Sequence, residues 1–543
     1  MEQPSLVSGI GANAYRGSRR VPSRPFSLLC IDRGVRVSLP ISRQVSAQAG
    51  SVKTTGSQDA PRSQAWQSTT ATPFPVTAVT HIGITTININ IKTNSNLAPA
   101  KIRNSHSFPP PNIRHSTHRD YPCPRALSPK GGGLCARPTT TTTTMIDLGL
   151  ARVGRLLQNT PQNWKAIHVA GTNGKGSICA YISAMLRSSG GVSCARFTSP
   201  HLVDRWDCIA IDDTPVSEEL FLYTEERVKR RNAEGGVGAT EFELLTATAF
   251  EIFHRQNVDY GVIEVGLGGR LDATNVLKQK AVTVIAKIGL DHQSFLGNTV
   301  EDIALQKAGI MRRGVPCVVD RTNQPSILKV IEEHAKEVGA DLHYPEAVSA
   351  PGLEPHQLQN LACAHLAFRL ARPEDKRSLE DLLPLIRQLE WPGRLQKLDL
   401  SKVTSRQQDV LLDGAHNSQS AEVLAAYVQR HLRSQDQPVT WVVAATQGKD
   451  MDGIFGLLLQ PGDRVSAVRF GPVDGMPWVK PSDPAELLAV ASKYGIEPCQ
   501  QHDAGDNVRG ALEWASERAG GFPLVIAGSL YLVSSVFRVL RQA

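Results

Sequence analysis

The stretch His168-Val-Ala-Gly-Thr-Asn-Gly-Lys-Gly-Ser177 is a glycine-rich turn that carries one lysine and ends on a serine. The apolar segment before it, 166–170, predicts a strand, and the segment after it, 178–189, predicts a helix. Backbone N–H groups of such a turn, a helix N-terminus and a lysine together attract phosphate. The stretch therefore predicts a nucleotide-binding loop, with a purely structural strand–turn–helix corner as the alternative.

This loop departs from the strict P-loop pattern at two positions. Val169 stands where the first glycine belongs, and Gly176 separates Lys175 from Ser177. The serine hydroxyl is still placed to reach a Mg²⁺ ion bound to phosphate.

The chain beyond Met145 alternates short apolar segments with amphipathic ones. This alternation predicts an α/β fold, with a parallel sheet covered on both faces. The further strands that we expect lie at 192–197, 260–265, 281–288 and 315–319, and the helices at 217–230 and 243–255.

A second α/β block follows the proline-containing segment 345–355. It has its own apolar set, which predicts a separate, smaller Rossmann-like domain. We therefore expect an ATP-binding domain at 145–348 and a C-terminal domain at 356–543. The second block's expected strands are 409–412, 439–445, 465–470 and 523–527, and its helices 420–432 and 484–494.

Residues 1–144 differ from the rest in composition. They contain 17 Lys and Arg against four Asp and Glu, and they show no sustained hydrophobic period. We expect a disordered leader, either a mitochondrial transit peptide or a gene-model artefact with translation starting near Met145 in the cytoplasm.

The remaining 399 residues contain 42 basic and 47 acidic side chains, a net charge of −5. The positive net charge of the whole chain, +8, therefore comes from the leader. This distribution gives no reason to expect nucleic acid as a partner. The nine cysteines show no C-x-x-C pair, which favours reduced thiols over disulfides or a metal site. No apolar run is long enough to predict a membrane span.

Several polar side chains stand at the ends of the predicted strands, where α/β sheets bind ligands. Ser199 follows one strand, Glu264 ends another and His292 follows a third; Lys307 lies in a later helix. A carboxylate in an apolar strand is costly to bury alone, so Glu264 is expected to face a cation, with a salt bridge to Arg270 as the alternative.

Two further segments have both a binding and a structural interpretation. Thr240-Glu-Phe-Glu243 opens a predicted helix, so its polar groups either cap that helix or face a substrate. The turn at 266–269 allows close approach of a ligand, with Asp272 and Asn275 beside it. In the second block, Arg394 is expected to neutralise phosphate and Asp413 to hold a ribose hydroxyl, or both to form interdomain ion pairs.

Together these segments resemble the folylpolyglutamate synthase and dihydrofolate synthase family of Mur-type ligases. The resemblance covers essentially all of 145–543. The motifs that carry it are HVAGTNGKGS (168–177), TSPHL (198–202), EVGLGGRLDATN (264–275), GLDH (289–292), LQKAGI (305–310), WPGR (391–394), DGAHN (413–417) and AGSLYL (527–532).

The resemblance implies a role for each matching residue, with Lys175, His292 and Lys307 catalytic and Lys307 carbamylated. ATP would be bound by Thr172, Asn173, Gly174, Lys175, Gly176, Ser177, Asn360, Arg394 and Asp413. Magnesium would be held by Ser177, Ser199, Glu264, His292 and Lys307. Dihydropteroate would contact Ile146, Asp147, Leu148, Thr240, Glu241, Phe242, Glu243, Leu271, Asp272 and Ala273.

We therefore expect an ATP- and Mg²⁺-dependent ligase that joins L-glutamate to dihydropteroate through an acyl phosphate. The segment Ile146-Asp-Leu-Gly149 favours dihydrofolate synthase over folylpolyglutamate synthase, and a bifunctional enzyme stays open. A P-loop protein that binds nucleotide and switches partners is the alternative from another class. We expect a monomer whose partners are small molecules, without nucleic acid or membrane.

Overall fold

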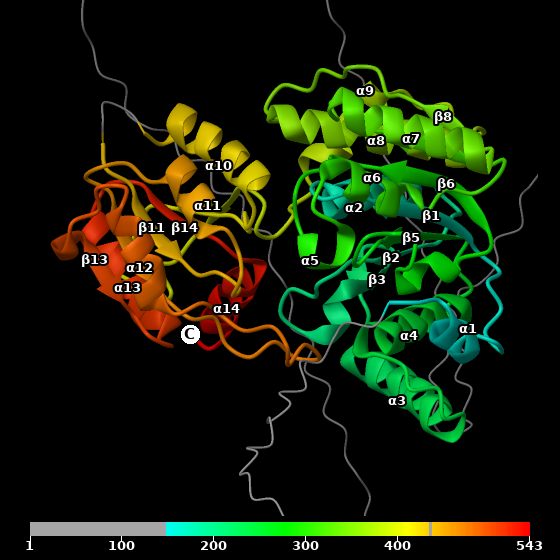
Figure 1. Cartoon of the computed structure of the whole chain (residues 1–543), viewed down its shortest axis with the longest axis horizontal. Helices are drawn as coiled ribbons and strands as arrows, with labels where there is room; N and C mark the ends of the chain where they lie inside the picture. Colours follow the sequence, from blue (N-terminus) through cyan, green and yellow to red (C-terminus); the bar gives the residue numbers. More distant parts are fainter. Residues whose placement is uncertain (1–147, 434–436) are drawn as a thin grey trace, which may run out of the picture. The chain divides into compact units, whose positions relative to one another are not determined.

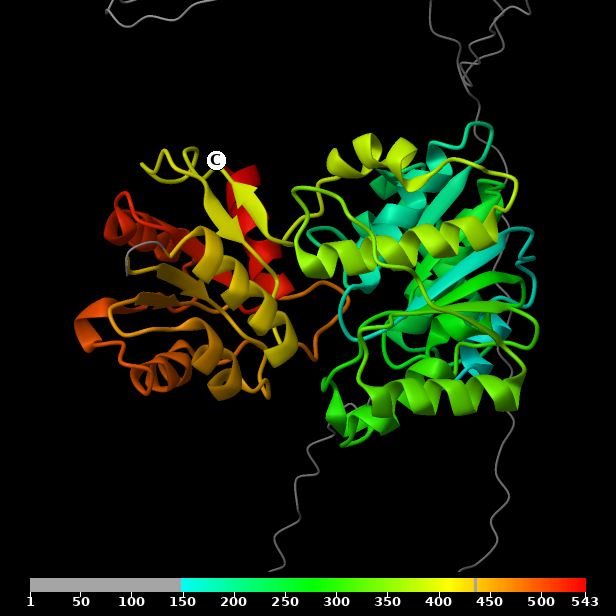
Figure 2. The same ribbon diagram turned by 90° about the horizontal axis from the view of Figure 1, so that it is seen from above.

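A computed structural model describes residues 148–433 and 437–543 (Figure 1). The predicted leader and the site residues Ile146 and Asp147 lie outside this range. The described residues form two sheets, each with helices on both faces, as the alternation of segments predicts (Figure 2). None of the described helices is long and apolar enough to cross a membrane.

The first sheet has eight strands in the order β4-β3-β2-β5-β1-β6-β7-β8. The six strands β2, β5, β1, β6, β7 and β8 are parallel to one another. Strands β3 and β4 add an antiparallel edge. The strands are β1 (Lys165–Ala170), β2 (Cys194–Phe197), β3 (Ile209–Ile211), β4 (Thr214–Pro215), β5 (Tyr260–Glu264), β6 (Lys280–Ile285), β7 (Pro316–Val319) and β8 (Asp341–His343). All five predicted strands of this block are therefore confirmed, with shifted ends.

Nine helices accompany the first sheet within the described residues. They are α1 (Ala151–Leu156), α2 (Lys175–Arg187), α3 (Glu218–Glu234), α4 (Glu241–Arg255), α5 (Gln293–Leu296), α6 (Val300–Ala308), α7 (Pro325–Val338), α8 (Pro355–Ala371) and α9 (Leu379–Arg387). We call the first sheet with these helices the first lobe.

Alternate side chains of β1 pack on opposite faces of the sheet, as the period of a strand requires. Ile167 and Val169 pack with α2, α8 and α9. Ala166 packs with α3 and α4 on the other face, where α6 and α7 also lie, farther along the sheet. Helices α8 and α9 were not predicted from the sequence. They fall almost entirely within the predicted domain 356–543, but their buried residues pack in the core of the first sheet.

The second sheet has six strands in the order β13-β12-β11-β14-β10-β9, all parallel except β9. Its strands are β9 (Gln396–Leu398), β10 (Val410–Leu412), β11 (Thr440–Val443), β12 (Arg464–Ala467), β13 (Gln501–Asp503) and β14 (Leu524–Ala527). Its helices are α10 (Ser418–His431), α11 (Met451–Leu458), α12 (Pro484–Ser492), α13 (Val508–Ala519) and α14 (Leu530–Arg541). We call these elements the second lobe.

The second lobe has one apolar cluster on each face of its sheet. Helices α10, α11 and α12 pack against Trp441 and Val443 of β11, whereas α13 and α14 pack against Val442 of the same strand. This packing holds the loop after β10 and the start of α10 at the C-terminal ends of the parallel strands. The polar residues of the candidate site lie there.

Candidate active site

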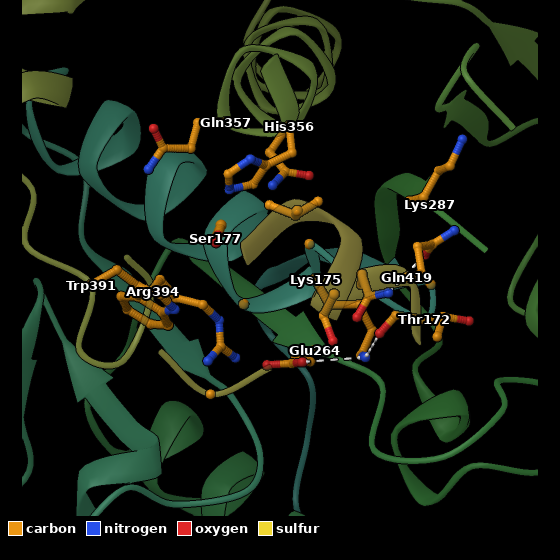
Figure 3. A pocket seen from close by; sticks show the side chains of 18 of the residues that line it. Thr172, Lys175, Ser177, Glu264, Lys287, His356, Gln357, Trp391, Arg394 and Gln419 are labelled. Carbon is orange, nitrogen blue, oxygen red and sulfur yellow. Dashed lines mark hydrogen bonds and ion pairs between the residues drawn. The ribbon is translucent and has the colours of Figure 1, made fainter. Parts of the chain in front are cut away.

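A cavity of about 520 Å³ is lined by residues of both lobes. All of the predicted nucleotide-binding and metal-binding residues line it, and Figure 3 shows several of their side chains around the phosphate loop. The structure therefore brings together residues that are far apart in the sequence and that were singled out one motif at a time.

The phosphate loop joins β1 to α2, as the sequence predicts. Its backbone is tied to the end of β6, because the N–H groups of Thr172 and Asn173 donate to the Lys287 carbonyl at 2.8 and 3.1 Å. The Thr172 hydroxyl also donates to Gly289 O at 3.0 Å. Gly174 precedes α2 with a φ of +86°, a conformation that glycine adopts without strain.

Both departures from the P-loop pattern have a packing reason. Val169 is a fully buried residue of β1 and belongs to the strand core, not to the turn. Gly176 lies against Trp391, since a Cβ atom added to it would be 3.3 Å from the Trp391 ring and 3.4 Å from Glu264 Oε2. The inserted glycine therefore leaves room for the Trp391 ring beside the phosphate loop.

Glu264 ends β5 at the floor of the cavity and is buried. Its Oε1 lies 3.7 Å from Lys175 Nζ, and its Oε2 accepts a hydrogen bond from Ser199 N at 3.3 Å. Burial raises the pKa of the Glu264 carboxyl, and Lys175 and Arg394 oppose that shift. Among protein groups Glu264 therefore pairs with Lys175, and not with Arg270 as in the salt-bridge alternative (Figure 3).

His292 and Lys307 reach the cavity from α5 and α6. His292 precedes α5 with a φ of 53°, and desolvation is the main reason that the pKa of its imidazole falls to about 4. Lys307 is buried and donates from Nζ to Gly171 O at 2.8 Å. Burial, with Lys175 nearby, lowers the pKa of Lys307 to about 7, so a large share of this amine is uncharged at neutral pH.

The glycines of the turn at 266–269 seat this turn against α6. A Cβ atom on Gly269 would lie 2.9 Å from the carbonyl oxygens of Gln306 and Lys307. One on Gly309 would lie 2.4 Å from the Cβ of Arg270. The close approach fixes the loop after Glu264 directly on the helix that carries Lys307.

The donor set of the cavity suits a magnesium ion. No group of three or more His, Cys, Asp and Glu side chains in the described part of the chain is arranged to hold a metal. Ser177, Ser199 and Glu264 nevertheless line the same cavity and offer oxygen atoms, with His292 beside them. Magnesium is usually held by one or two carboxylates together with substrate phosphates and water, so a complete protein cage is not required.

The other predicted ATP contacts come from the second lobe, from the segment just before it and from α8 of the first lobe. Asp413 follows β10, is buried, and accepts from Leu395 N at 2.7 Å and Ala415 N at 2.8 Å. Burial raises the pKa of Asp413, and Arg394 opposes the shift. Asn360 comes from α8 of the first lobe and lies directly against Gly174.

Of the residues predicted to contact dihydropteroate, those that the structure describes do not line this cavity. Thr240 and Glu243 form a capping box at the start of α4, and Glu243 pairs with Arg152 at 2.8 Å, so the capping alternative is confirmed for both. Phe242 lies against Gly266, behind the turn that follows Glu264.

The remaining residues of that predicted set differ in exposure. Asp272 is buried and accepts from the N–H groups of Leu267 and Thr274, which closes the loop on itself. Leu271 is 44% exposed, whereas Ala273 is buried. Leu148 and Glu241 are described, but neither lines the cavity.

Several polar residues of the cavity wall were not singled out from the sequence. Among them are Lys287, His356, Gln357 and Gln419 (Figure 3). Gln419 comes two residues after DGAHN, so a polar residue beside a strand-end motif was the available signal. The other three carry no local pattern that separates them from ordinary surface residues.

Comparison with known proteins agrees with this arrangement. Residues 396–539 match the family described as dihydrofolate synthetase, C-terminal domain. The chain is 38% identical over 421 residues to a probable dihydrofolate synthetase of Schizosaccharomyces pombe, covering 73% of this chain and 99% of the relative.

Two solved structures are similar over most of their length. Escherichia coli FolC in complex with DHPP and ADP is 26% identical with a TM-score of 0.60, covering 73% of this chain and 95% of that one. A bifunctional folylpolyglutamate synthase/dihydrofolate synthase with Mn, AMPPNP and L-glutamate bound is 27% identical with a TM-score of 0.61, covering 73% and 95%. The fold and the motifs agree, and the chain belongs to the dihydrofolate synthase and folylpolyglutamate synthase family.

Proposed function

We propose that this protein is an ATP-dependent ligase that joins L-glutamate to 7,8-dihydropteroate and so makes dihydrofolate. The observation that carries the proposal is the cavity in which a phosphate loop, Glu264 and Lys307 meet Arg394 and Asp413. The similarity to a dihydrofolate synthetase over 99% of that relative supports the choice of substrate.

In this proposal ATP lies along the phosphate loop. Backbone N–H groups of the loop and the start of α2 contact its phosphates, and Lys175 and Arg394 neutralise their charge. Asn360 adds an amide contact, and Asp413 accepts from a ribose hydroxyl. Ser177, Ser199, Glu264 and His292 would hold Mg²⁺, which when bound offsets the negative charge that develops on the phosphates.

The reaction has two steps. A carboxylate oxygen of dihydropteroate attacks the terminal phosphorus of ATP, ADP leaves, and an acyl phosphate forms. The glutamate amine then attacks the acyl carbon, and phosphate leaves from the tetrahedral intermediate. Lys175 stabilises charge on the transferred phosphoryl group, and the cavity walls keep water from the acyl phosphate.

Lys307 has a separate proposed role as a carbamate. Its amine would attack CO₂ and lose a proton, which converts a buried cation into an anion beside the magnesium site. The lowered pKa of Lys307 supports this role, because only the uncharged amine reacts. The hydrogen bond from Nζ to Gly171 O holds the amine at the phosphate loop.

The decisive experiment compares acid substrates. With ATP and glutamate, the full-length protein should consume dihydropteroate and release one ADP for each dihydrofolate formed. Extension of tetrahydrofolate alone would replace the proposal by folylpolyglutamate synthase, and use of both acids would indicate a bifunctional enzyme. Nucleotide binding without glutamate-dependent ADP release would favour the partner-switching alternative.

We further propose that residues 145–348 and 356–543 correspond to the two ligase domains, except that α8 and α9 pack with the first. The basic leader is proposed to be either removed on import into mitochondria or absent when translation starts near Met145. Sequencing the mature N-terminus distinguishes these two cases. A monomeric enzyme is proposed, and its mass in solution tests that point.

A further inference from the structure

Two helices from different lobes form facing walls of the nucleotide cavity. From the first lobe, the start of α8 contributes His356, Gln357, Gln359 and Asn360 to the lining. From the second lobe, α10 contributes Gln419, Ser420, Glu422 and Val423. A nucleotide in this cavity is therefore enclosed only while α10 stays next to the first lobe.

The N-terminal end of α10 is tied to the phosphate loop. Gln419 Oε1 accepts from Asn173 Nδ2 at 2.7 Å, and Gln419 Nε2 donates to Ile288 O at 3.2 Å. Gln419 packs closely against Gly289, which has no side chain. A Cβ atom on Gly289 would be 3.1 Å from the Gln419 amide.

The C-terminal end of α10 is tied to the beginning of α8. Glu354, the residue before α8, accepts from Arg430 Nη1 at 2.6 Å, and its other oxygen lies 2.9 Å from His431 Nε2. The Glu354 side chain is only 18% exposed, although Arg430 and His431 are about half exposed. Since Arg430 follows Gln419 by 11 residues on α10, the two attachments are about 17 Å apart along the helix axis.

These contacts close a ring around the cavity. The phosphate loop contacts α8 where Asn360 lies against Gly174, α8 contacts α10 through Glu354, and α10 returns to the loop through Gln419. Glu354, like its partners Arg430 and His431, does not line the cavity. It can therefore hold the walls together without touching the nucleotide.

We infer that Glu354 is a positioning residue whose contact with Arg430 and His431 keeps α10 over the bound nucleotide and slows the release of ADP. The inference rests on the proposed function, because it assumes that the cavity holds adenine nucleotide. Release of a product from a closed site requires its walls to separate, and every contact that resists separation lengthens the product's stay. Because Arg430 and His431 are about half exposed, the ion pair is weak, and losing it should speed the release of ADP by about two- to fivefold.

The test measures the release of a fluorescent ADP analogue from the full-length protein by stopped flow. Glu354→Gln keeps an oxygen for the cap of α8 and removes the charge; Arg430→Gln leaves α8 unchanged and removes the partner. Each variant should release the analogue about two to five times faster than the wild type. The double variant Glu354→Arg with Arg430→Glu exchanges the two charges. It should reverse at least half of the increase in release rate seen in the single variants.

A matched control is Asp452→Asn, which removes an exposed ion pair with Lys493 inside the second lobe. Its release rate should equal that of the wild type. The inference is overturned if Glu354→Gln and Arg430→Gln both release the analogue at the wild-type rate, or if the exchanged pair is no slower than the single variants. Failure of the wild type to bind the analogue would instead refute the proposed function.

Discussion

Gly174→Ala gives a quantitative test of the phosphate loop. The backbone of Gly174 has a φ of +86°, so a side chain there costs about 1 kcal/mol in strain. The new Cβ would also lie 2.2 Å from Oδ1 of Asn360, a distance that no stable contact allows. Either Asn360 or the loop must move, and both are proposed ATP contacts.

The expected loss of ADP affinity follows from those two contacts. Hydrogen bonds to a charged group contribute about 1.5–3 kcal/mol each, so losing both, about 3–6 kcal/mol, weakens binding by about 100- to 10,000-fold. Isothermal titration of ADP with Mg²⁺ measures this change, and thermal unfolding measures the strain separately.

Gly190→Ala is the matched control, because it separates strain from collision. Gly190 also has a positive φ, of 57°, but a Cβ atom there would meet nothing within 4 Å. This variant should lose about 1 kcal/mol of stability and keep its affinity for ADP. The reasoning is refuted if Gly174→Ala binds ADP as tightly as Gly190→Ala does.

Three further predictions concern single side chains. Lys307→Ala should keep the fold and lose most activity, and in the wild type added bicarbonate should raise activity; full activity of the variant removes the carbamate proposal. Burial lowers the pKa of His356 to about 4, so the folded protein binds fewer protons than the unfolded chain between pH 6.5 and 4. Unfolding measured across that window should show stability falling as the pH falls, and less so in His356→Gln; equal slopes contradict the assignment. Asp463 is fully buried and pairs with Arg433 at 2.7 Å, so Asp463→Ala should lose about 3–5 kcal/mol in denaturant unfolding, whereas a loss below 1 kcal/mol contradicts a structural role.

The sequence predicted the parts of the site that depend on local patterns. The turn from β1 into α2 follows from its glycines and the flanking apolar segments. Glu264 stood out because a carboxylate at the end of a buried strand needs a partner, and Lys175 is that partner. These predictions required one assumption, that the carboxyl ends of neighbouring parallel strands lie at the same edge of the sheet.

The parts that depend on distant packing were beyond such patterns. Helix α8 is apolar around much of its circumference, so its sequence shows no clear face, and its place on the first sheet is set by tertiary contacts. Asp272 was expected beside a ligand, but its short side chain closes its own loop on Leu267 and Thr274. Gln419 joins the site only because the two lobes meet there.

The central claim is that the cavity activates the carboxylate of dihydropteroate by phosphorylation. The most direct measurement uses dihydropteroate labelled with ¹⁸O in its carboxylate, with ATP, Mg²⁺ and L-glutamate, and determines the isotope content of the released phosphate by mass spectrometry. Attack of the carboxylate on ATP predicts one ¹⁸O atom in each phosphate released. Phosphate that contains oxygen from the solvent and none from dihydropteroate would contradict the account.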